Sequence, residues 1–228
     1  MKKIALILFF ISAVGVVVSQ VTDSLYLHWI TKPMIMITLG VYYVAASGHR
    51  SASVLFAIVF SLAGDVFLMF DRSFSEAFIL GLTAFLLAHI FFILAYRQHR
   101  DESEENALKG IQKIRFSFPI ILAGTGLIVV LYPSLGSLKI PVMIYALVLI
   151  LMVVNAVLRY GRTSINSFWL VFIGSASFML SDALLAINKF FKPLRAAGLW
   201  VMSFYMLAQC SIILGIVEHV RQKGKSKA

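Results

Sequence analysis

The chain has 228 residues, of which 61% are hydrophobic and only 13% are charged, and its mean hydropathy is +0.93. Because a soluble domain has roughly 45–50% apolar residues, this composition excludes a soluble globular fold and indicates an integral membrane protein. The net charge is +10, but the basic residues lie at the ends of apolar runs and not along one helical face, which argues against a nucleic-acid partner. The single cysteine, Cys210, excludes an intrachain disulfide and a cysteine-based zinc site.

Eight apolar runs follow one another along the chain, and about 20 apolar residues are enough to cross a bilayer as a helix. The runs are Ile4–Gln20, Pro33–Ser47, Ser51–Phe70, Phe74–Tyr96, Phe116–Tyr132, Ile140–Leu158, Phe168–Ile187 and Ala196–Val217. They predict an all-α, polytopic bundle of about eight transmembrane helices. We expect a single integral membrane domain over residues 1–228, with a loop at about 97–115 and a basic tail at 218–228.

The positions of the basic residues predict the orientation, since cytoplasmic loops are enriched in Lys and Arg. With the N-terminus inside, 14 of the 20 Lys and Arg residues fall on the inner side. The outer side receives Lys32, Arg72, Lys139, Lys189, Lys192 and Arg195. This bias favours eight crossings with both termini cytoplasmic over the alternative in which the first run is a secretory signal peptide. A bacterial inner membrane is the expected location.

Two carboxylates, Asp65 and Asp182, lie inside apolar runs, and the other eight Asp and Glu residues lie in loops or near helix ends. An ionisable group at membrane depth costs a few kcal/mol or more, so it usually faces a cavity and has a function. The alternative is a structural aspartate that is hydrogen-bonded to a neighbouring helix.

The surroundings of the two aspartates repeat. Each aspartate follows a small residue, and each is followed by a basic residue after seven positions and by a glycine after sixteen. The two sets are Gly64, Asp65, Arg72 and Gly81, and Ser181, Asp182, Lys189 and Gly198. This echo predicts two four-helix halves and similar depths for the two carboxylates, about 9–10 Å from the outer helix ends. The two could then meet across a helix interface. Chance similarity between two apolar hairpins remains the alternative.

Other polar residues inside the runs are more typical of interhelical hydrogen bonds than of catalysis. These are His89, Tyr96, Tyr145, Asn155, Tyr205 and Gln209. His89 is expected about 10 Å from the level of the aspartates, which argues against direct proton transfer between them. The sequence contains no phosphate-binding loop, no serine nucleophile elbow and no His-x-x-x-His metal pair. It therefore gives no support for a serine or zinc hydrolase.

Short motifs spread over nearly the whole chain resemble the YhhN-like lysoplasmalogenase family of polytopic membrane proteins. They are Thr31-Lys32-Pro33 opening the second helix, Gly64-Asp65-Val66, Gly81 through Phe85 to Ala88-His89, Tyr145 with Met152, Gly174 through Phe178 to Ser181-Asp182, Lys189-Phe190, and Tyr205 with Ala208-Gln209. Three positions depart from the family pattern: Ser175 stands in place of Ala, and Phe204 and Met206 in place of Thr and Tyr.

The resemblance implies hydrolysis of the vinyl ether bond of lysoplasmalogens, with a lysophospholipid as substrate, membrane lipids as surroundings, and no metal or other cofactor. It implies Asp65 and Asp182 as catalytic residues. The residues implied for substrate binding are Lys32, His89, Tyr145, Ser181, Lys189, Tyr205 and Gln209. Nothing in the sequence indicates an oligomeric state.

Two carboxylates suit this chemistry, because a vinyl ether is cleaved by protonation at carbon and capture of the resulting oxocarbenium ion by water. Two nearby carboxylates in a low dielectric do not both ionise readily, so one is expected to stay protonated as the acid. We expect Asp182 to be that acid, because Phe178, Ser181 and Leu185 place few charges near it. Lys32, Arg72 and Lys189 are expected near the head-group phosphate, or else serve as interfacial anchors.

Two other interpretations use the same aspartates. A proton- or cation-coupled transporter, or a lipid-handling protein, would hold an ion between two repeated halves. An intramembrane aspartyl protease would need a Gly-x-Gly-Asp motif, and Leu62 occupies the position of its first glycine.

Overall fold

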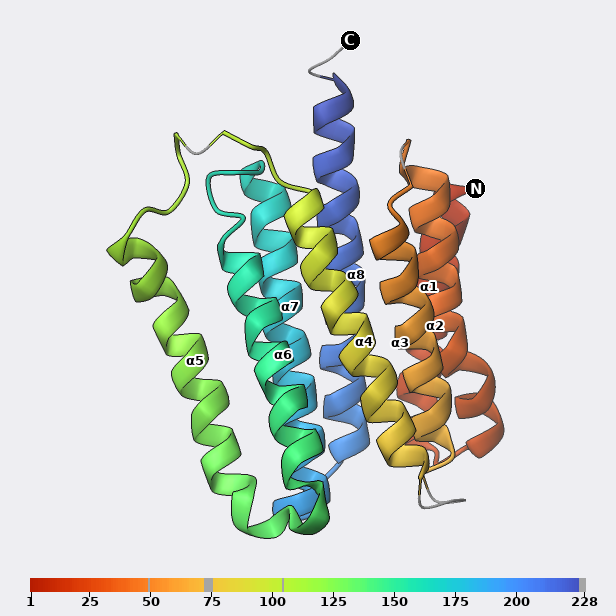
Figure 1. Ribbon diagram of the computed structural model, residues 1–228. Helices are drawn as coiled ribbons and strands as arrows, with labels where there is room; N and C mark the ends of the chain where they lie inside the picture. The colour runs from red at the N-terminus through yellow and green to blue at the C-terminus, as the bar shows by residue number, and fades with distance from the viewer. Residues whose placement is uncertain (49, 72–75, 104, 226–228) are drawn as a thin grey trace. The chain divides into compact units, whose positions relative to one another are not determined.

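The computed structural model describes residues 1–48, 50–71, 76–103 and 105–225 (Figure 1). These residues form eight α-helices and no strand, and all eight helices are long and apolar enough to span a membrane. The helices are α1 (Lys2–Val21), α2 (Leu25–Ala46), α3 (Ala52–Met69), α4 (Ala77–Gln98), α5 (Ile111–Leu131), α6 (Lys139–Val157), α7 (Ile165–Ala186) and α8 (Ala197–Lys225). The prediction of an all-α, multi-pass membrane protein is confirmed.

Three short elements connect the later helices. Two 3-10 turns, η1 (Tyr132–Ser134) and η2 (Gly136–Leu138), join α5 to α6. A π-helical turn, η3 (Ile187–Phe191), extends α7. Such turns are often found at functional sites within helices, and η3 begins five residues after Asp182.

The largest difference from the predicted elements is at the start of α2. The sequence places Thr31-Lys32-Pro33 at the opening of this helix, which is wrong, because α2 begins at Leu25 with Ser24 as its N-cap. Polar residues in the first turns of α2 lower its hydropathy, so the start of the helix does not stand out in the sequence. In the structure these residues have hydrogen-bonding partners within α2 or on α1. The Thr31 hydroxyl donates to the carbonyl of Leu27, and His28 Nδ1 lies 3.3 Å from the Ser19 hydroxyl of α1.

Two connections also differ from the pattern. The predicted loop at about 97–115 narrows to residues 99–110, because α4 continues to Gln98 and α5 begins at Ile111. The predicted tail begins as helix, since α8 continues to Lys225. Polar, charged residues can extend a helix beyond the apolar run that crosses the membrane.

The chain divides into two compact units, one from Met1 to Ala95 and the other from Tyr96 to the end of α8. In the first unit α1 packs on α2 and α2 on α3; in the second, α7 and α8 form the most extensive helix pair, with α6 on α7 and α5 on α6. The division follows the two predicted halves closely, except that the last residues of α4 belong with the second.

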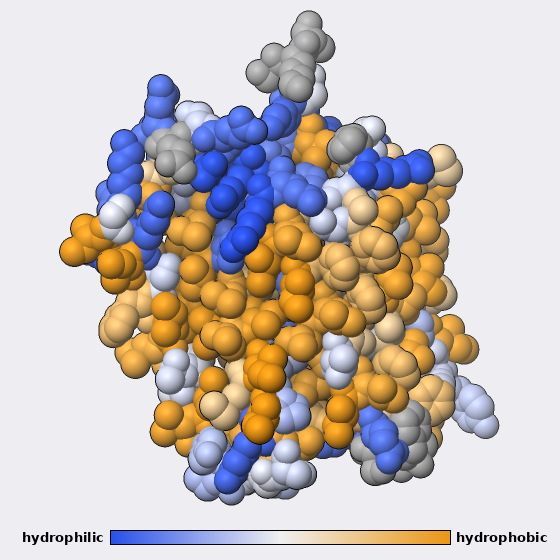
Figure 2. Space-filling view, viewed as in Figure 1, coloured by the Kyte–Doolittle hydropathy of each residue, from blue (hydrophilic) through white to orange (hydrophobic). Residues whose placement is uncertain are grey.

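The faces left exposed on these helices are apolar, as a bilayer requires. Large hydrophobic side chains such as Phe10 of α1 and Leu122 of α5 are exposed. Figure 2 shows the same distribution on one face of the protein, where hydrophobic residues cover the middle of the helices and hydrophilic residues gather toward their ends. Because lipid solvates such surfaces, they need no protein cover.

Candidate active site

Asp65 lies in the first unit on a tightly packed part of α3. The side chain is only 2% exposed. The preceding residue, Gly64, faces the ring of Phe85 on α4, and a Cβ at this glycine would lie 2.6 Å from that ring. Gly81 of α4 faces Leu68 in the same way, at 2.8 Å. The two glycines let α3 and α4 approach closely, which fixes the backbone that carries Asp65.

Lys32 of α2 is the basic residue that acts on Asp65. Its side chain is 7% exposed, and it has an electrostatic interaction with the Asp65 carboxylate. The sequence placed Lys32 on the outer side, at the opening of the second helix; the structure buries it inside that helix. The reason is that hydropathy cannot tell a lysine at the end of a helix from one that faces a buried carboxylate.

His89 of α4 is fully buried in the same unit. It lies four residues after Phe85 in an antiparallel helix, and Phe85 faces Gly64. His89 is therefore about one helical turn, roughly 5–6 Å, further along α4 than the level of Gly64. This places it near the neighbourhood of Asp65 but in the next layer of side chains.

Asp182 lies in the second unit, on α7, and its partner comes from α6. The Tyr145 hydroxyl donates a hydrogen bond of 2.5 Å to Asp182 Oδ2. Tyr145 is buried, 8% exposed, whereas Asp182 is half-buried. The length of this hydrogen bond is at the short end of the range for O–H···O hydrogen bonds. The bond fixes the position of one carboxylate oxygen.

Ser181 and Tyr205 hold α7 against α8 beside this carboxylate. The Ser181 hydroxyl donates to the carbonyl of Val201 at 2.9 Å. The ring of Tyr205 packs edge-on against Phe178, with centroids 5.6 Å apart. Gln209 follows Tyr205 by one turn of α8 and is fully buried. The contacts of Ser181 and Tyr205 are those of residues that position helix α7.

Lys189 follows Asp182 by about two helical turns, in the turn that extends α7. It is an exposed residue of the π-helical turn η3. Seven residues separate it from Asp182, which is roughly 10 Å along a helix axis. The backbone of Lys189 is therefore roughly 10 Å further along the helix than that of Asp182. The segment that follows η3 is held by a hydrogen bond from the backbone N–H of Leu194 to Asn188 Oδ1, at 2.9 Å.

A buried polar network that the sequence pattern did not indicate lies at the opposite end of the second unit. Its centre is Arg159, which is fully buried and donates from Nη2 to the carbonyl of His99 and to the Ser167 hydroxyl, both at 3.0 Å. Ser167 in turn donates to the carbonyl of Gly215 at 2.6 Å. Burial lowers the pKa of Arg159 to about 10, so the guanidinium is charged at neutral pH. Counting Arg159 only as an inner-side charge concealed this role.

Two of the predicted interhelical residues make hydrogen bonds in the same unit. The Tyr96 hydroxyl is 2.8 Å from that of Ser175, and the Tyr96 ring lies beneath the Arg159 guanidinium, 5.8 Å from its centroid. Asn155 Oδ1 accepts a hydrogen bond from Arg97 Nε at 3.0 Å. The interpretation of Tyr96 and Asn155 as hydrogen-bonding groups is confirmed, and Ser175, a departure from the family pattern, serves as the partner of Tyr96.

The described residues contain no group of three or more His, Cys, Asp and Glu side chains able to hold a metal ion. Within its own unit, each aspartate has a different kind of neighbour: the charge of Lys32 acts on Asp65, and the Tyr145 hydroxyl donates to Asp182. Because the two belong to different units, a meeting of their carboxylates stays a prediction. The arrangement within each unit is that of a polytopic membrane protein with an acidic side chain at membrane depth.

Comparison with known proteins places this architecture in a family. Residues 27–216 match the YhhN family, and the chain belongs to it. It is 28% identical over 195 residues to the lysoplasmalogenase of Mycobacterium bovis, covering 82% of this chain and 71% of that protein. It is 29% identical over 191 residues to lysoplasmalogenase TMEM86B of Sus scrofa (84% and 75%) and over 178 residues to lysoplasmalogenase TMEM86A of Homo sapiens (75% and 68%). No solved structure matches the chain.

Proposed function

We propose that this protein is a lysoplasmalogenase, a membrane enzyme that hydrolyses the vinyl ether bond of a lysoplasmalogen to a fatty aldehyde and a glycerophospho-head group. The observation that carries the proposal is its membership of the YhhN family together with similarity to three lysoplasmalogenases over most of their length. Buried acidic residues in a membrane protein are consistent with this activity, because the reaction needs an acid.

In the proposed mechanism Asp182 is the acid. It transfers its proton to the alkene carbon distal to the ether oxygen, and the alkene electron pair forms the new C–H bond. The remaining cation is an oxocarbenium ion stabilised by the ether oxygen. Tyr145 supports this role, because its hydroxyl is a neutral donor to Oδ2. A neutral donor stabilises a charged carboxylate less than a cation does, and in a low dielectric this favours the protonated form of Asp182.

Asp65 is the proposed carboxylate that stays ionised. Lys32 supports this role, since a nearby cation favours the charged form of a carboxylate. Asp65 would stabilise the oxocarbenium ion electrostatically and take a proton from the water that attacks its carbon. The hemiacetal then collapses to the aldehyde, and the glycerol oxygen leaves with a proton.

Aldehyde release from alkenyl-lysophosphatidylethanolamine by the purified protein tests the proposal. We expect Asp65→Asn and Asp182→Asn each to lower kcat by about 10³-fold, within the range for general acid–base groups. Asp23→Asn is the matched control, because Asp23 is exposed and has a positive φ of 51° that Asn also tolerates. Size-exclusion chromatography checks that each variant is folded.

Isotopes test the bond that breaks. In H₂¹⁸O the glycerophospho product should contain no ¹⁸O, since its oxygen stays on glycerol; in D₂O the aldehyde should carry deuterium on the carbon next to its carbonyl. Absence of aldehyde from the folded wild type across pH and head groups contradicts the proposal. A proton flux in proteoliposomes that requires both aspartates and forms no product would instead support the transporter.

A further inference from the structure

A groove opens in the second unit, remote from Asp182. It has a volume of about 580 Å³ and lies among the segment 105–109, the start of α5, the end of α6 and the start of α7. Phe168 and Phe172, which line it, precede Asp182 by 14 and 10 residues, roughly 21 and 15 Å along α7. The groove is therefore separate from the Asp182 side of the candidate active site. Its volume is typical of a pocket that binds one small ligand.

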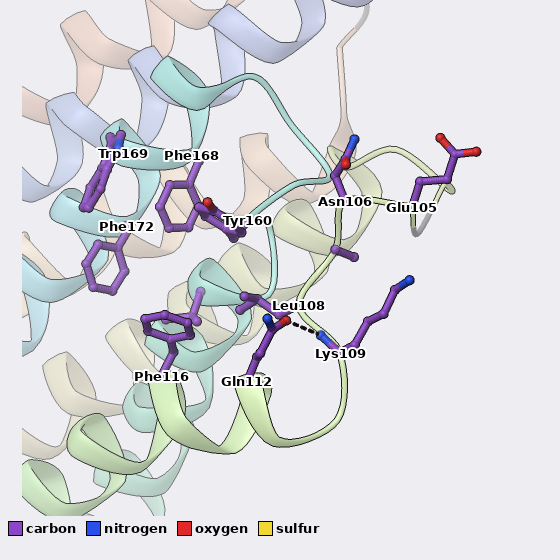
Figure 3. Close-up of a pocket in the computed structure, with 12 residues that line it drawn as sticks. Glu105, Asn106, Leu108, Lys109, Gln112, Phe116, Tyr160, Phe168, Trp169 and Phe172 are labelled. Carbon is purple, nitrogen blue, oxygen red and sulfur yellow. Dashed lines mark hydrogen bonds between the residues drawn. The ribbon is translucent and has the colours of Figure 1, made fainter.

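The groove is polar along one side and aromatic along the other. Figure 3 shows Phe116 of α5 opposite Phe168 and Phe172 of α7, with the polar residues at the other side. The polar side includes Asn106, Lys109 and Gln112, with Glu105 at its edge. A cavity divided in this way matches a ligand with an apolar chain and a polar head.

The polar side is held in place by backbone contacts. The N–H of Lys109 donates to Gln112 Oε1 at 3.0 Å, which ties the segment to the first turn of α5. Gly161 has a positive φ of 68°, and a Cβ there would overlap the carbonyl of Asn106. The N–H of Asp101 also donates to the carbonyl of Arg162 at 2.7 Å. These contacts join the 99–110 connection to the turn between α6 and α7 and shape the groove.

The aromatic side of the groove also extends to the surface of the unit. Phe116 is 53% exposed, Trp169 48% and Tyr160 43%. In a membrane-spanning unit, aromatic residues near helix ends lie at the boundary between acyl chains and head groups. A lipid chain can therefore enter the groove sideways from the bilayer.

We propose that the groove binds a lysophospholipid with a zwitterionic phosphoethanolamine head group. Its single chain lies against Phe116, Phe168 and Phe172. Its phosphate pairs with Lys109 and its ammonium group with Glu105, so that the two charges of the ligand match the two charges of the groove. One groove accommodates one chain, which selects a lysophospholipid over a diacyl lipid. This binding does not depend on the proposed hydrolysis.

Trp169 is a natural reporter for this site, since the chain has only three tryptophans and Trp169 lines the groove. One variant keeps Trp169 alone (Trp29→Phe and Trp200→Phe), and the matched control keeps Trp200 alone (Trp29→Phe and Trp169→Phe). Trp200 is 54% exposed, similar to Trp169, but does not line the groove. Both are titrated in detergent with lysophosphatidylethanolamine that carries a brominated chain, which quenches tryptophan fluorescence on contact.

We expect saturable quenching of Trp169 at a lipid mole fraction at least tenfold below that for Trp200. Lys109→Gln should raise the half-saturation value about tenfold, the effect of losing one charge-assisted hydrogen bond. Lys113→Gln, at an exposed residue outside the groove, should not change it. Ala107→Phe should fill the groove and abolish the difference between the tryptophans, with helix content by circular dichroism checking the fold.

Equal quenching of Trp169 and Trp200, or equal binding of brominated diacyl phosphatidylethanolamine, overturns the proposal and indicates bulk lipid contact. Saturable binding that Lys109→Gln leaves unchanged also overturns it, because the head group would then not lie at Lys109. The Asp182→Asn variant separates the two proposals. It should keep full Trp169 quenching whether or not aldehyde release is lost.

Discussion

The two membrane-embedded aspartates occupy corresponding places in the sequence but have different neighbours in the structure. Asp65 is almost fully buried in the first unit and interacts with the charge of Lys32. Asp182 is half-buried in the second unit and accepts a hydrogen bond from the neutral hydroxyl of Tyr145. Repetition thus provides two carboxylates, whereas the chemical difference between them comes from α2 and α6, outside the repeated motif.

Differences in environment of this kind are how two carboxylates take different roles in one reaction. The helix ends differ as well. Asp65 is four residues from the end of α3, and Asp182 is nine residues from the end of η3. Equal depth in the membrane thus stays a prediction, and the chemical contrast between Lys32 and Tyr145 is the feature to test.

The largest expected effect concerns both aspartates together. If Asp65 and Asp182 act in one step, the double variant Asp65→Asn/Asp182→Asn should lose about as much kcat as the more damaging single variant, because groups that act as a unit are strongly non-additive. The rate of aldehyde release by the two single variants and the double variant gives the coupling. Losses that multiply would mean that the carboxylates act independently.

The second prediction concerns the charge beside Asp65. Lys32→Met keeps the volume of the side chain and removes its charge, so Asp65 loses the cation that favours its ionised form. We expect kcat to fall by about 10–100-fold, since the substitution weakens electrostatic stabilisation of the oxocarbenium ion, while KM changes less than about twofold. Steady-state kinetics of aldehyde release separate the two parameters.

Lys192→Gln is the control for this prediction, because Lys192 is exposed and lies outside the candidate site. A rise in KM with unchanged kcat for Lys32→Met would mean that Lys32 binds the head-group phosphate and does not act on Asp65. That result would remove the contrast between the two aspartates.

The third prediction concerns the neutral partner of Asp182. Tyr145→Phe removes one hydrogen bond and leaves the ring in place, so the carboxylate should stay in position less strictly. We expect kcat to fall about tenfold, the effect of a hydrogen bond of about 1.5 kcal/mol, and therefore less than for Lys32→Met. Tyr26→Phe, at an exposed tyrosine, is the control. A loss as large as for Asp182→Asn would show that the phenol itself takes part in proton transfer.

Hydropathy was sufficient to predict the helices, because the bilayer requires about 20 apolar residues for each crossing. It was insufficient at α2, where His28 and Lys32 lie inside the helix. Their polar groups make the start of a helix resemble a loop. The pattern contains no information about the neighbours that a polar residue meets on other helices.

For the candidate site, too, the sequence predicted the residues but not their contacts. Asp65, Asp182 and Tyr145 stood out as polar residues in apolar runs, but the hydrogen bond from Tyr145 depends on how α6 is rotated against α7. The burial of Arg159 was missed for a similar reason: a basic residue between two spanning helices normally indicates topology. Its partners, Ser167 and the carbonyl of His99, become neighbours only in the folded chain.

The smallest expected effects concern the helix pairs that hold the two aspartates. A Cβ at Gly64 would meet the ring of Phe85, a side chain, whereas a Cβ at Gly174 would lie 2.9 Å from the backbone oxygen of Ala208 on α8. A side chain can shift and a helix backbone cannot without moving the helix. Gly174→Ala should therefore destabilise the protein more than Gly64→Ala, by about 3 against about 1 kcal/mol.

Thermal unfolding in detergent measures the two losses, with Gly126→Ala as control. A Cβ at Gly126 would meet nothing within 4 Å, so this helical substitution should be neutral or stabilise by up to about 1 kcal/mol. If Gly64→Ala were the more damaging of the two, the α3–α4 pair would be the more rigid support. The burial of Asp65 would then reflect packing as much as its interaction with Lys32.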